Sequence, residues 1–164
     1  MGTGKTTVGR LLAEQTHFEF VDTDELIESR TGKTITDIFK QNGEPAFREL
    51  EKQVVAELAA RDKLVISCGG GLAANQANLD SLKTYALVVC LWASPDKIWQ
   101  RVRHQTHRPL LQEADPMAKI KTLLAVREPF YRQADVLINT DLRSVREAAQ
   151  QIALQFKLAT RNRR

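Results

Sequence analysis

Apolar and polar residues follow two different periods along the chain, and the period predicts which segments are helices and which are strands. Apolar residues three or four positions apart, as in KTTVGRLLAEQ near the start, are typical of helices that bury one face. Continuous apolar runs rich in β-branched residues, such as ALVVCLW, are typical of strands buried on both faces. The expected strands are 18–22, 64–68, 86–92 and 136–140, and the expected helices are 5–15, 24–30, 35–43, 44–62, 75–84, 94–102, 117–133 and 144–156.

Strands and helices take turns along the chain, and this order predicts the fold class. Alternation of this kind favours an α/β fold in three layers, with a parallel sheet between two layers of helices. The chain has 164 residues, and domains cluster around roughly 100 to 150 residues. We therefore expect a single domain over 1–164, with a polar, proline-containing loop that acts as a lid at about 104–118.

The composition is that of an ordinary globular protein, with 43% apolar and 27% charged residues. No apolar run approaches the roughly 20 residues that cross a bilayer, and no leader segment precedes the fold. We expect a cytoplasmic protein without a membrane partner. Cys68 and Cys90 stand in apolar runs without metal-ligand spacing, so both are expected to be reduced and buried. The net charge of +4 fits an anionic partner, which leaves a nucleic acid, a phosphate-bearing cofactor or an acidic metabolite.

The first residues, MGTGKTT, contain most of a phosphate-binding loop. Gly2 and Gly4 let backbone N–H groups approach phosphate oxygens, Lys5 adds a positive charge, and the following helix points its positive end at the same anion. Thr6 would supply a hydroxyl to Mg²⁺. The leading glycine of the full signature and the strand before it are not in the sequence. The alternative is a flexible start followed by an ordinary helix.

Two acidic residues stand at the end of the first expected strand, in VDTDELIE. Asp22 and Asp24 share a face if the extended conformation continues. One carboxylate could then orient hydrated Mg²⁺ while the other receives a hydroxyl proton, which are the two acidic tasks of a kinase. The alternative for Asp22 is that it only caps the next helix.

Arginines and glycines complete the set of candidate site residues. Three glycines directly after a buried strand, in SCGGGL, indicate a close approach of backbone to a ligand, or else a tight turn. Arg48 and Arg127 lie on expected helices, where an arginine is commonly solvated or paired with glutamate. Arg101 and Arg108 flank the expected lid, from which an arginine can stabilise a transferring phosphoryl group.

Six motifs, taken in order, closely resemble the shikimate kinase family. They are GTGKTT, DTDELIE, FKQNGEPAFRELE, CGGGL, RPLL and REPFY, and the match runs from Met1 to about Thr140. The resemblance implies a P-loop NTPase fold that uses ATP and Mg²⁺ to phosphorylate the 3-hydroxyl of shikimate in aromatic amino-acid biosynthesis.

The resemblance also implies a role for individual residues. Asp24 would position or deprotonate the substrate hydroxyl, Arg48 and Arg127 would bind the carboxylate and ring hydroxyls, and Gly70 would offer its backbone N–H. Lys5, Asp24 and Arg108 would be the catalytic residues, and Thr6 and, through water, Asp22 would hold Mg²⁺. The residues assigned to the nucleotide are Gly2, Thr3, Gly4, Lys5, Thr6, Thr7, Arg101, Arg108 and Arg143, of which Arg101 would stack on adenine and Arg143 flank it.

The sequence departs from the family at its start. The family's sheet has the order 2-3-1-4-5, and its central first strand has no counterpart here. We expect two strand edges to lack a partner as a result. A start chosen about ten residues late in the gene would explain the difference, and a form extended upstream would then be more active than this chain.

Three other functions stay open at this point. A related kinase could phosphorylate gluconate or a nucleotide, although the triple glycine with Arg48 and Arg127 argues against it. A related protein could bind ligands without turnover. Nucleic-acid binding is disfavoured because the arginines are scattered among site motifs. We expect a monomer that binds shikimate and ATP, with no nucleic-acid partner.

Overall fold

The computed structural model describes residues 2–104 and 115–161. All four predicted strands are confirmed, each four residues long. The elements are α1 (Lys5–Thr16), β1 (Glu19–Asp22), α2 (Thr23–Thr31), α3 (Ile35–Leu58), β2 (Leu64–Ser67), the 3-10 helix η1 (Leu72–Ala74), α4 (Gln76–Tyr85), β3 (Val89–Trp92), α5 (Pro95–Val102), α6 (Pro116–Tyr131), β4 (Val136–Asn139) and α7 (Val145–Arg161).

Helix α3 contains a break that the sequence predicts. Gly43 has φ 78° and ψ 171° inside the helix, a conformation that glycine adopts without steric cost. Pro45 follows in the first turn of the second segment, where its missing N–H costs no helical hydrogen bond. The two predicted helices are therefore confirmed as the two segments of α3 before and after Gly43.

The predicted lid ends earlier than expected. Asp115 accepts a hydrogen bond from the backbone N–H of Ala118 at 2.9 Å, which satisfies a donor in the first turn of α6. Because α6 begins at Pro116, the prediction of a loop up to 118 is wrong at its end. Residues 105–114 of the predicted lid, with Arg108, lie outside the described residues.

The strands form two separate parallel pairs. β1 pairs with β2, with Glu19 opposite Leu64 at one end of the ladder. β3 pairs with β4, with Val89 opposite Val136. Within residues 2–104 and 115–161 no strand connects β2 with β3. The α/β class with parallel strands is confirmed, and the position of the family's central strand holds no strand of the described chain.

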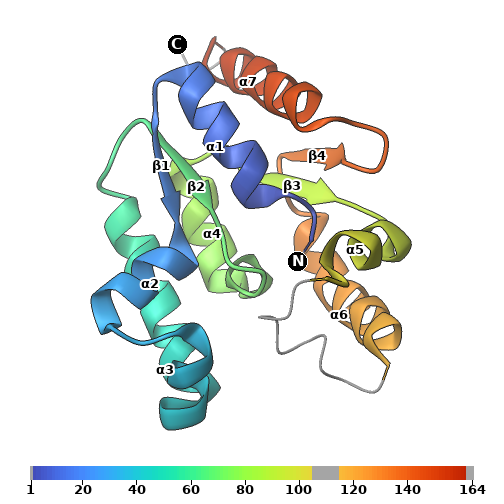
Figure 1. The fold of residues 1–164 in the computed structure, drawn as a ribbon. Helices are drawn as coiled ribbons and strands as arrows, with labels where there is room; N and C mark the ends of the chain where they lie inside the picture. Colours follow the sequence, from blue (N-terminus) through green and yellow to red (C-terminus); the bar gives the residue numbers. More distant parts are fainter. Residues whose placement is uncertain (1, 105–114, 162–164) are drawn as a thin grey trace.

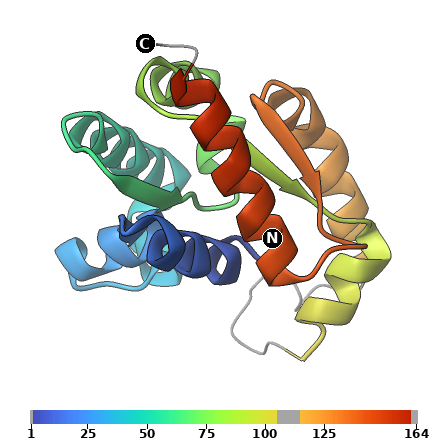
Figure 2. The ribbon, with the colours of Figure 1, turned by 90° about the horizontal axis from the view of Figure 1, so that it is seen from above.

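Helices cover both faces of the strands. Figures 1 and 2 show α1 and α7 on one face and α3, α4 and α6 on the other. The first layer packs through Leu12 and Ile152 against Ile138 of β4. On the opposite face, Val55 and Leu82 form a core cluster with Leu72. The molecule therefore has the three layers that the alternating pattern predicts.

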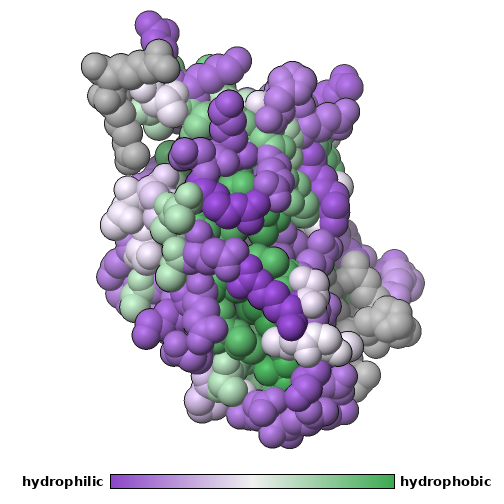
Figure 3. Space-filling model, turned by 90° about the vertical axis from the view of Figure 1, so that its left-hand side faces the viewer, coloured by the Kyte–Doolittle hydropathy of each residue, from purple (hydrophilic) through white to green (hydrophobic). Residues whose placement is uncertain are grey.

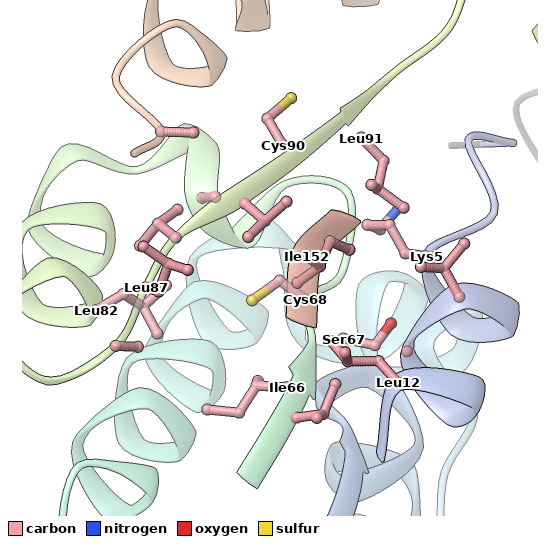
Figure 4. A pocket seen from close by; sticks show the side chains of 18 of the residues that line it. Lys5, Leu12, Ile66, Ser67, Cys68, Leu82, Leu87, Cys90, Leu91 and Ile152 are labelled. Carbon is pink, nitrogen blue, oxygen red and sulfur yellow. The ribbon is translucent and has the colours of Figure 1, made fainter. Parts of the chain in front are cut away.

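A cavity of about 700 Å³ lies between β2 and β3, and we call it the slot. Its walls are the two strands, with α1 and α7 closing one side and α4 and α6 the other. Figure 4 shows apolar side chains of both strands and both helical layers pointing into it. The slot therefore separates the two pairs of strands and has a mostly apolar lining.

The outer surface is mostly polar. On the face shown in Figure 3, hydrophilic side chains surround a narrower apolar area. No helix in the described ranges is long and apolar enough to cross a membrane.

Candidate functional site

The start of α1 is built to receive an anion. Gly2 and Gly4 have φ of 65° and 88°, in the left-handed region that favours glycine. Gly4 is the N-cap residue and has no side-chain hydrogen bond to the helix. The first N–H groups of a helix have no partner within the helix. Those of α1 therefore remain available, together with the positive end of the helix dipole, for phosphate oxygens.

Asp22 accepts hydrogen bonds both from the start of α1 and from the start of α2. Its Oδ1 accepts hydrogen bonds from the backbone N–H groups of Asp24 at 3.1 Å and Glu25 at 3.5 Å. Its Oδ2 accepts a hydrogen bond from Oγ1 of Thr6 at 3.2 Å. Because helix α2 begins at Thr23, the predicted extended conformation through Asp24 is wrong. Asp22 does cap α2, but its contact with Thr6 means that capping is not all it does.

The pair of Thr6 and Asp22 fits the way proteins hold Mg²⁺. Magnesium keeps several waters and takes one or two carboxylates together with substrate phosphates, rather than a cage made of protein ligands. Among the described residues no three His, Cys, Asp or Glu side chains gather into a metal site. One carboxylate and one hydroxyl beside an uncapped helix start are therefore suited to a magnesium ion that arrives with a nucleotide.

The three glycines after β2, residues 69–71, form a turn that we call the glycine turn. It leaves room for an acidic side chain. The N–H of Gly69 donates to Oγ1 of Thr23 at 2.9 Å, which ties the turn to the start of α2. A Cβ atom added to Gly69 would overlap the carboxylate of Asp24. Gly69 does not have a positive φ, so the space beside the backbone, not its conformation, requires a glycine here.

The other end of the turn receives a guanidinium group. A Cβ atom on Gly71 would stand 2.6 Å from Nη1 of Arg48. Arg48 donates from Nη1 to Glu51 at 2.7 Å, and from Nη2 and Nε to Glu44 at 2.7 and 3.2 Å. The alternative that Arg48 is paired with neighbouring glutamates therefore holds, and the same arginine also lies against the glycine turn.

Glu51 is a buried carboxylate that positions this arginine. It is only 1% exposed, although it is charged and belongs to α3. Burial raises the pKa of Glu51, against the hydrogen bond and charge of Arg48, which lower it. Burial alone would lower the pKa of Arg48, but the hydrogen bonds that it donates to Glu51 and Glu44 raise it overall. Asp24 and Arg127 also act on Glu51 electrostatically, so these four side chains share one region.

The middle of the glycine turn is held by α6. Tyr131 donates its hydroxyl hydrogen to the carbonyl oxygen of Gly70 at 3.1 Å. Burial raises the pKa of this tyrosine, and the positive charge of Arg127 opposes the rise. Arg127 therefore lies beside Tyr131, close to the turn.

Lys5 lies in the slot. It is one of the residues that line the cavity, and Figure 4 shows its side chain reaching in toward β3. Burial raises the pKa of Cys68 to about 12, and Lys5 opposes the rise. The pKa of Cys90 is raised in the same way. Both cysteines are free thiols, but they are half-buried in the walls of the slot, so the prediction that they are buried is wrong.

The two arginines predicted for the adenine lie at the carboxyl end of β4. Arg101 donates to the carbonyl oxygen of Thr140 at 2.6 Å, to Oγ1 of Thr140 at 3.0 Å and to the carbonyl oxygen of Gly2 at 3.3 Å. Arg143 donates to the carbonyl oxygen of Asn139 at 2.9 Å. Arg101 therefore connects the phosphate loop to the end of β4, a structural contact that the sequence does not predict.

The predicted residues gather in two adjoining groups. The loop from Gly2 to Thr7 meets Asp22, with Thr3 buried and Thr7 exposed on α1. The glycine turn meets Asp24, Arg48 and the region of Arg127. Sequence reasoning missed four residues that build these groups, although all four stand inside the quoted motifs: Thr23, Glu44, Glu51 and Tyr131.

Known proteins were compared with the chain. Residues 1–157 match the family model described as shikimate kinase. The chain is 48% identical over 142 residues to shikimate kinase from Hahella chejuensis, covering 86% of this chain and 74% of that protein. A structure of shikimate kinase from Acinetobacter baumannii in complex with shikimate has a TM-score of 0.89 and 43% identity, covering 98% of this chain and 89% of that one. A gluconokinase from Sinorhizobium meliloti has a TM-score of 0.58 at 20% identity, over 97% of this chain and 92% of that one, and shares only the fold.

Proposed function

The chain belongs to the shikimate kinase family, and from this premise we propose that it transfers the γ-phosphoryl group of ATP to the 3-hydroxyl of shikimate. The family uses ATP with Mg²⁺. The glycine turn is the main observation that supports the proposal. The carboxylate of Asp24 lies against Gly69 at one end of the turn, and the guanidinium of Arg48 lies against Gly71 at the other. A small acid with several hydroxyls needs both groups.

The acceptor half of the site matches the chemistry of shikimate. A guanidinium group binds a carboxylate through two parallel hydrogen bonds. Arg48 and Arg127 supply positive charge for the substrate's carboxylate and ring hydroxyls, and the turn around Gly70 forms the neighbouring wall. Asp24 accepts the proton of the 3-hydroxyl as the hydroxyl oxygen bonds to the γ-phosphorus of ATP, and the bond from that phosphorus to the bridging oxygen breaks to release ADP.

The nucleotide half uses the start of α1. Backbone N–H groups from Gly2 to Thr7 bind phosphate oxygens, and Lys5 adds its charge. Thr6 and, through water, Asp22 would hold Mg²⁺, which would supply charge neutralisation at the phosphates. Arg101 and Arg143 flank the adenine, and Arg108 covers the transferring phosphoryl group.

The oligomeric state and the compartment are part of the proposal. We propose a monomer that acts in the cytoplasm and has neither nucleic acid nor membrane as a partner. Free thiols at Cys68 and Cys90 support a reducing compartment.

The experiment measures ADP release from MgATP with shikimate, with gluconate or with a nucleoside monophosphate as acceptor. Release that depends on shikimate alone is the expected result, and Arg48→Lys should raise the KM for shikimate because a lysine cannot form the paired hydrogen bonds. Faster release with gluconate or the nucleotide would overturn the proposal. Shikimate binding without any ADP release would indicate a binding protein instead.

A further inference from the structure

Three glycines in succession leave the glycine turn without side chains that could hold its shape. Glycine loses more conformational freedom on folding than any other residue, so the turn depends on hydrogen bonds from other elements. Gly69 donates such a bond to Thr23 of α2 at 2.9 Å. The carbonyl oxygen of Gly70 accepts one from the hydroxyl of Tyr131 in α6 at 3.1 Å. Tyr131 is therefore the residue that fixes the middle of the turn.

The hydrogen bond from Tyr131 fixes an N–H group as well as a carbonyl group. The carbonyl of Gly70 and the N–H of Gly71 belong to one peptide unit, which is planar and trans, so the two groups point in opposite directions. Because the carbonyl points to Tyr131, the N–H of Gly71 points away from that side chain. A Cβ atom on Gly71 would lie 2.6 Å from Nη1 of Arg48. The tyrosine thus sets the orientation of the peptide that lies beside this guanidinium.

Tyr131 also lies beside the second arginine of the acceptor half. Arg127 and Tyr131 are four residues apart on α6, and side chains at this spacing are neighbours on the surface of a helix. Burial raises the pKa of Tyr131, while the charge of Arg127 and a hydrogen bond with it oppose the rise. A tyrosine hydroxyl can donate one hydrogen bond and accept another. The same hydroxyl therefore joins the backbone of the glycine turn to the guanidinium of Arg127.

We propose that Tyr131 is a positioning residue of the acceptor site, which holds the glycine turn and Arg127 in the arrangement that binds the carboxylate and hydroxyls of shikimate. This inference deepens the proposed function and rests on it. The groups that Tyr131 holds are those assigned to the acceptor, whereas the phosphate contacts belong to the start of α1. The hydroxyl of Tyr131 therefore contributes to the binding of shikimate, and not to the binding of ATP or to the transfer itself.

The other tyrosine of the chain provides a matched control, because it makes the same kind of hydrogen bond away from the glycine turn. Tyr85 donates its hydroxyl hydrogen to the carbonyl oxygen of Val55 at 3.1 Å, the same distance as between Tyr131 and Gly70. Tyr131→Phe and Tyr85→Phe each remove one hydroxyl and keep the ring. Both variants should unfold at a lower urea concentration than the wild type, by similar amounts, because each leaves a carbonyl group without its partner.

Steady-state kinetics of shikimate-dependent ADP release separate a positioning role from a general loss of structure. Tyr131→Phe should raise the KM for shikimate about fivefold, the factor that corresponds to one neutral hydrogen bond. The kcat and the KM for ATP should change by less than about twofold, because only the binding of the acceptor is affected. Tyr85→Phe should leave all three constants near the wild-type values. A lower kcat with unchanged KM in Tyr131→Phe, or equal effects of the two substitutions, would overturn the proposal.

A double-mutant cycle tests whether the effect passes through Arg127. Arg127→Lys should itself raise the KM for shikimate, because a lysine cannot form the paired hydrogen bonds of a guanidinium group. Adding Tyr131→Phe to this variant should then raise the KM less than it does in the wild type, since substitutions of residues in one hydrogen-bonded group are not additive. Fully additive effects would overturn the role assigned to the contact between the two residues.

Hydrogen exchange of the protein without ligands distinguishes a failure of this inference from a failure of the proposed function. The N–H of Gly69 donates to Thr23, and the N–H of Leu72 donates to the carbonyl oxygen of Gly69 at 3.2 Å. Both N–H groups should exchange severalfold faster in Tyr131→Phe than in Tyr85→Phe. Equal exchange in the two variants would overturn the positioning role even if the wild type phosphorylates shikimate. If the wild type released no ADP with shikimate, the proposed function would fail, whereas faster exchange in Tyr131→Phe would still support the hold of this tyrosine on the turn.

Discussion

Replacing Glu51 by glutamine should change the stability of the protein and its affinity for shikimate in opposite directions. The carboxylate is 1% exposed, and burial raises its pKa above the value in an unfolded chain. The fold therefore disfavours the charge despite Arg48. A neutral amide of the same size removes that penalty, and Glu44 still accepts hydrogen bonds from Arg48. We therefore expect Glu51→Gln to unfold at a higher urea concentration than the wild type at pH 7.

The pH dependence of stability follows from the same shift. A carboxyl group whose pKa is higher in the folded state favours folding at acidic pH, where it is protonated. That contribution is lost as the pH rises from the ordinary glutamate value through the raised pKa of Glu51. The free energy of unfolding of the wild type, relative to Glu51→Gln, should therefore fall across this interval in urea titrations at successive pH values.

Shikimate binding, in contrast to stability, should become weaker in Glu51→Gln. The variant loses the charge-assisted hydrogen bond of 2.7 Å that holds Nη1 of Arg48. Such bonds contribute about 1.5 to 3 kcal/mol, which corresponds to roughly tenfold to a hundredfold in affinity. Because Glu44 still accepts two hydrogen bonds from Arg48, we expect the lower end, about a tenfold loss of shikimate affinity by calorimetry.

Glu44→Gln is the matched control, since it alters the same arginine from the same helix. The side chain of Glu44 is 61% exposed, and exposed ion pairs contribute about 0 to 1 kcal/mol. Stability and shikimate affinity should both change little. A loss of stability in Glu51→Gln at pH 7, or equal effects of the two substitutions on affinity, would refute the positioning role of the buried carboxylate.

Two further sets of substitutions test other parts of the site. Asp22→Ala should cost about 1 kcal/mol of stability because α2 loses its cap, whereas Asp22→Asn keeps the cap. Both variants should raise the Mg²⁺ concentration needed for half-maximal ADP release. Equal stability of the two variants would contradict the capping role. Gly69→Ala should mainly lower kcat because its Cβ displaces Asp24, and Gly71→Ala should mainly raise the KM for shikimate because it presses on Arg48. Steady-state kinetics that show the same change for both glycines would refute this division.

The strands and the close approach at the glycine turn could be predicted from the sequence, since both depend on local signals. The run ALVVCLW predicts β3, and Gly43 predicts the break in α3. The three glycines after β2 indicated a close approach, and two of them do admit side chains that carry chemistry, those of Asp24 and Arg48.

Contacts set by tertiary packing could not be predicted. The spacing of Arg48 and Glu51 predicts neighbours on a helix, but only the packing of α3 makes one of them buried. β1 ends at Asp22, two residues before Asp24, because capping α2 satisfies two backbone donors. Lys5 points into the slot between β2 and β3, a cavity that no local pattern records.

The two halves of the site depend on the slot to different degrees. Side-chain hydrogen bonds tie the acceptor half to three elements: Thr23 of α2 to Gly69, Glu51 of α3 to Arg48, and Tyr131 of α6 to Gly70. None of these contacts involves the free edges of β2 or β3. The phosphate half instead has Lys5 inside the slot. A substitution in the lining of the slot that moves Lys5 should therefore change nucleotide affinity and leave shikimate affinity nearly the same.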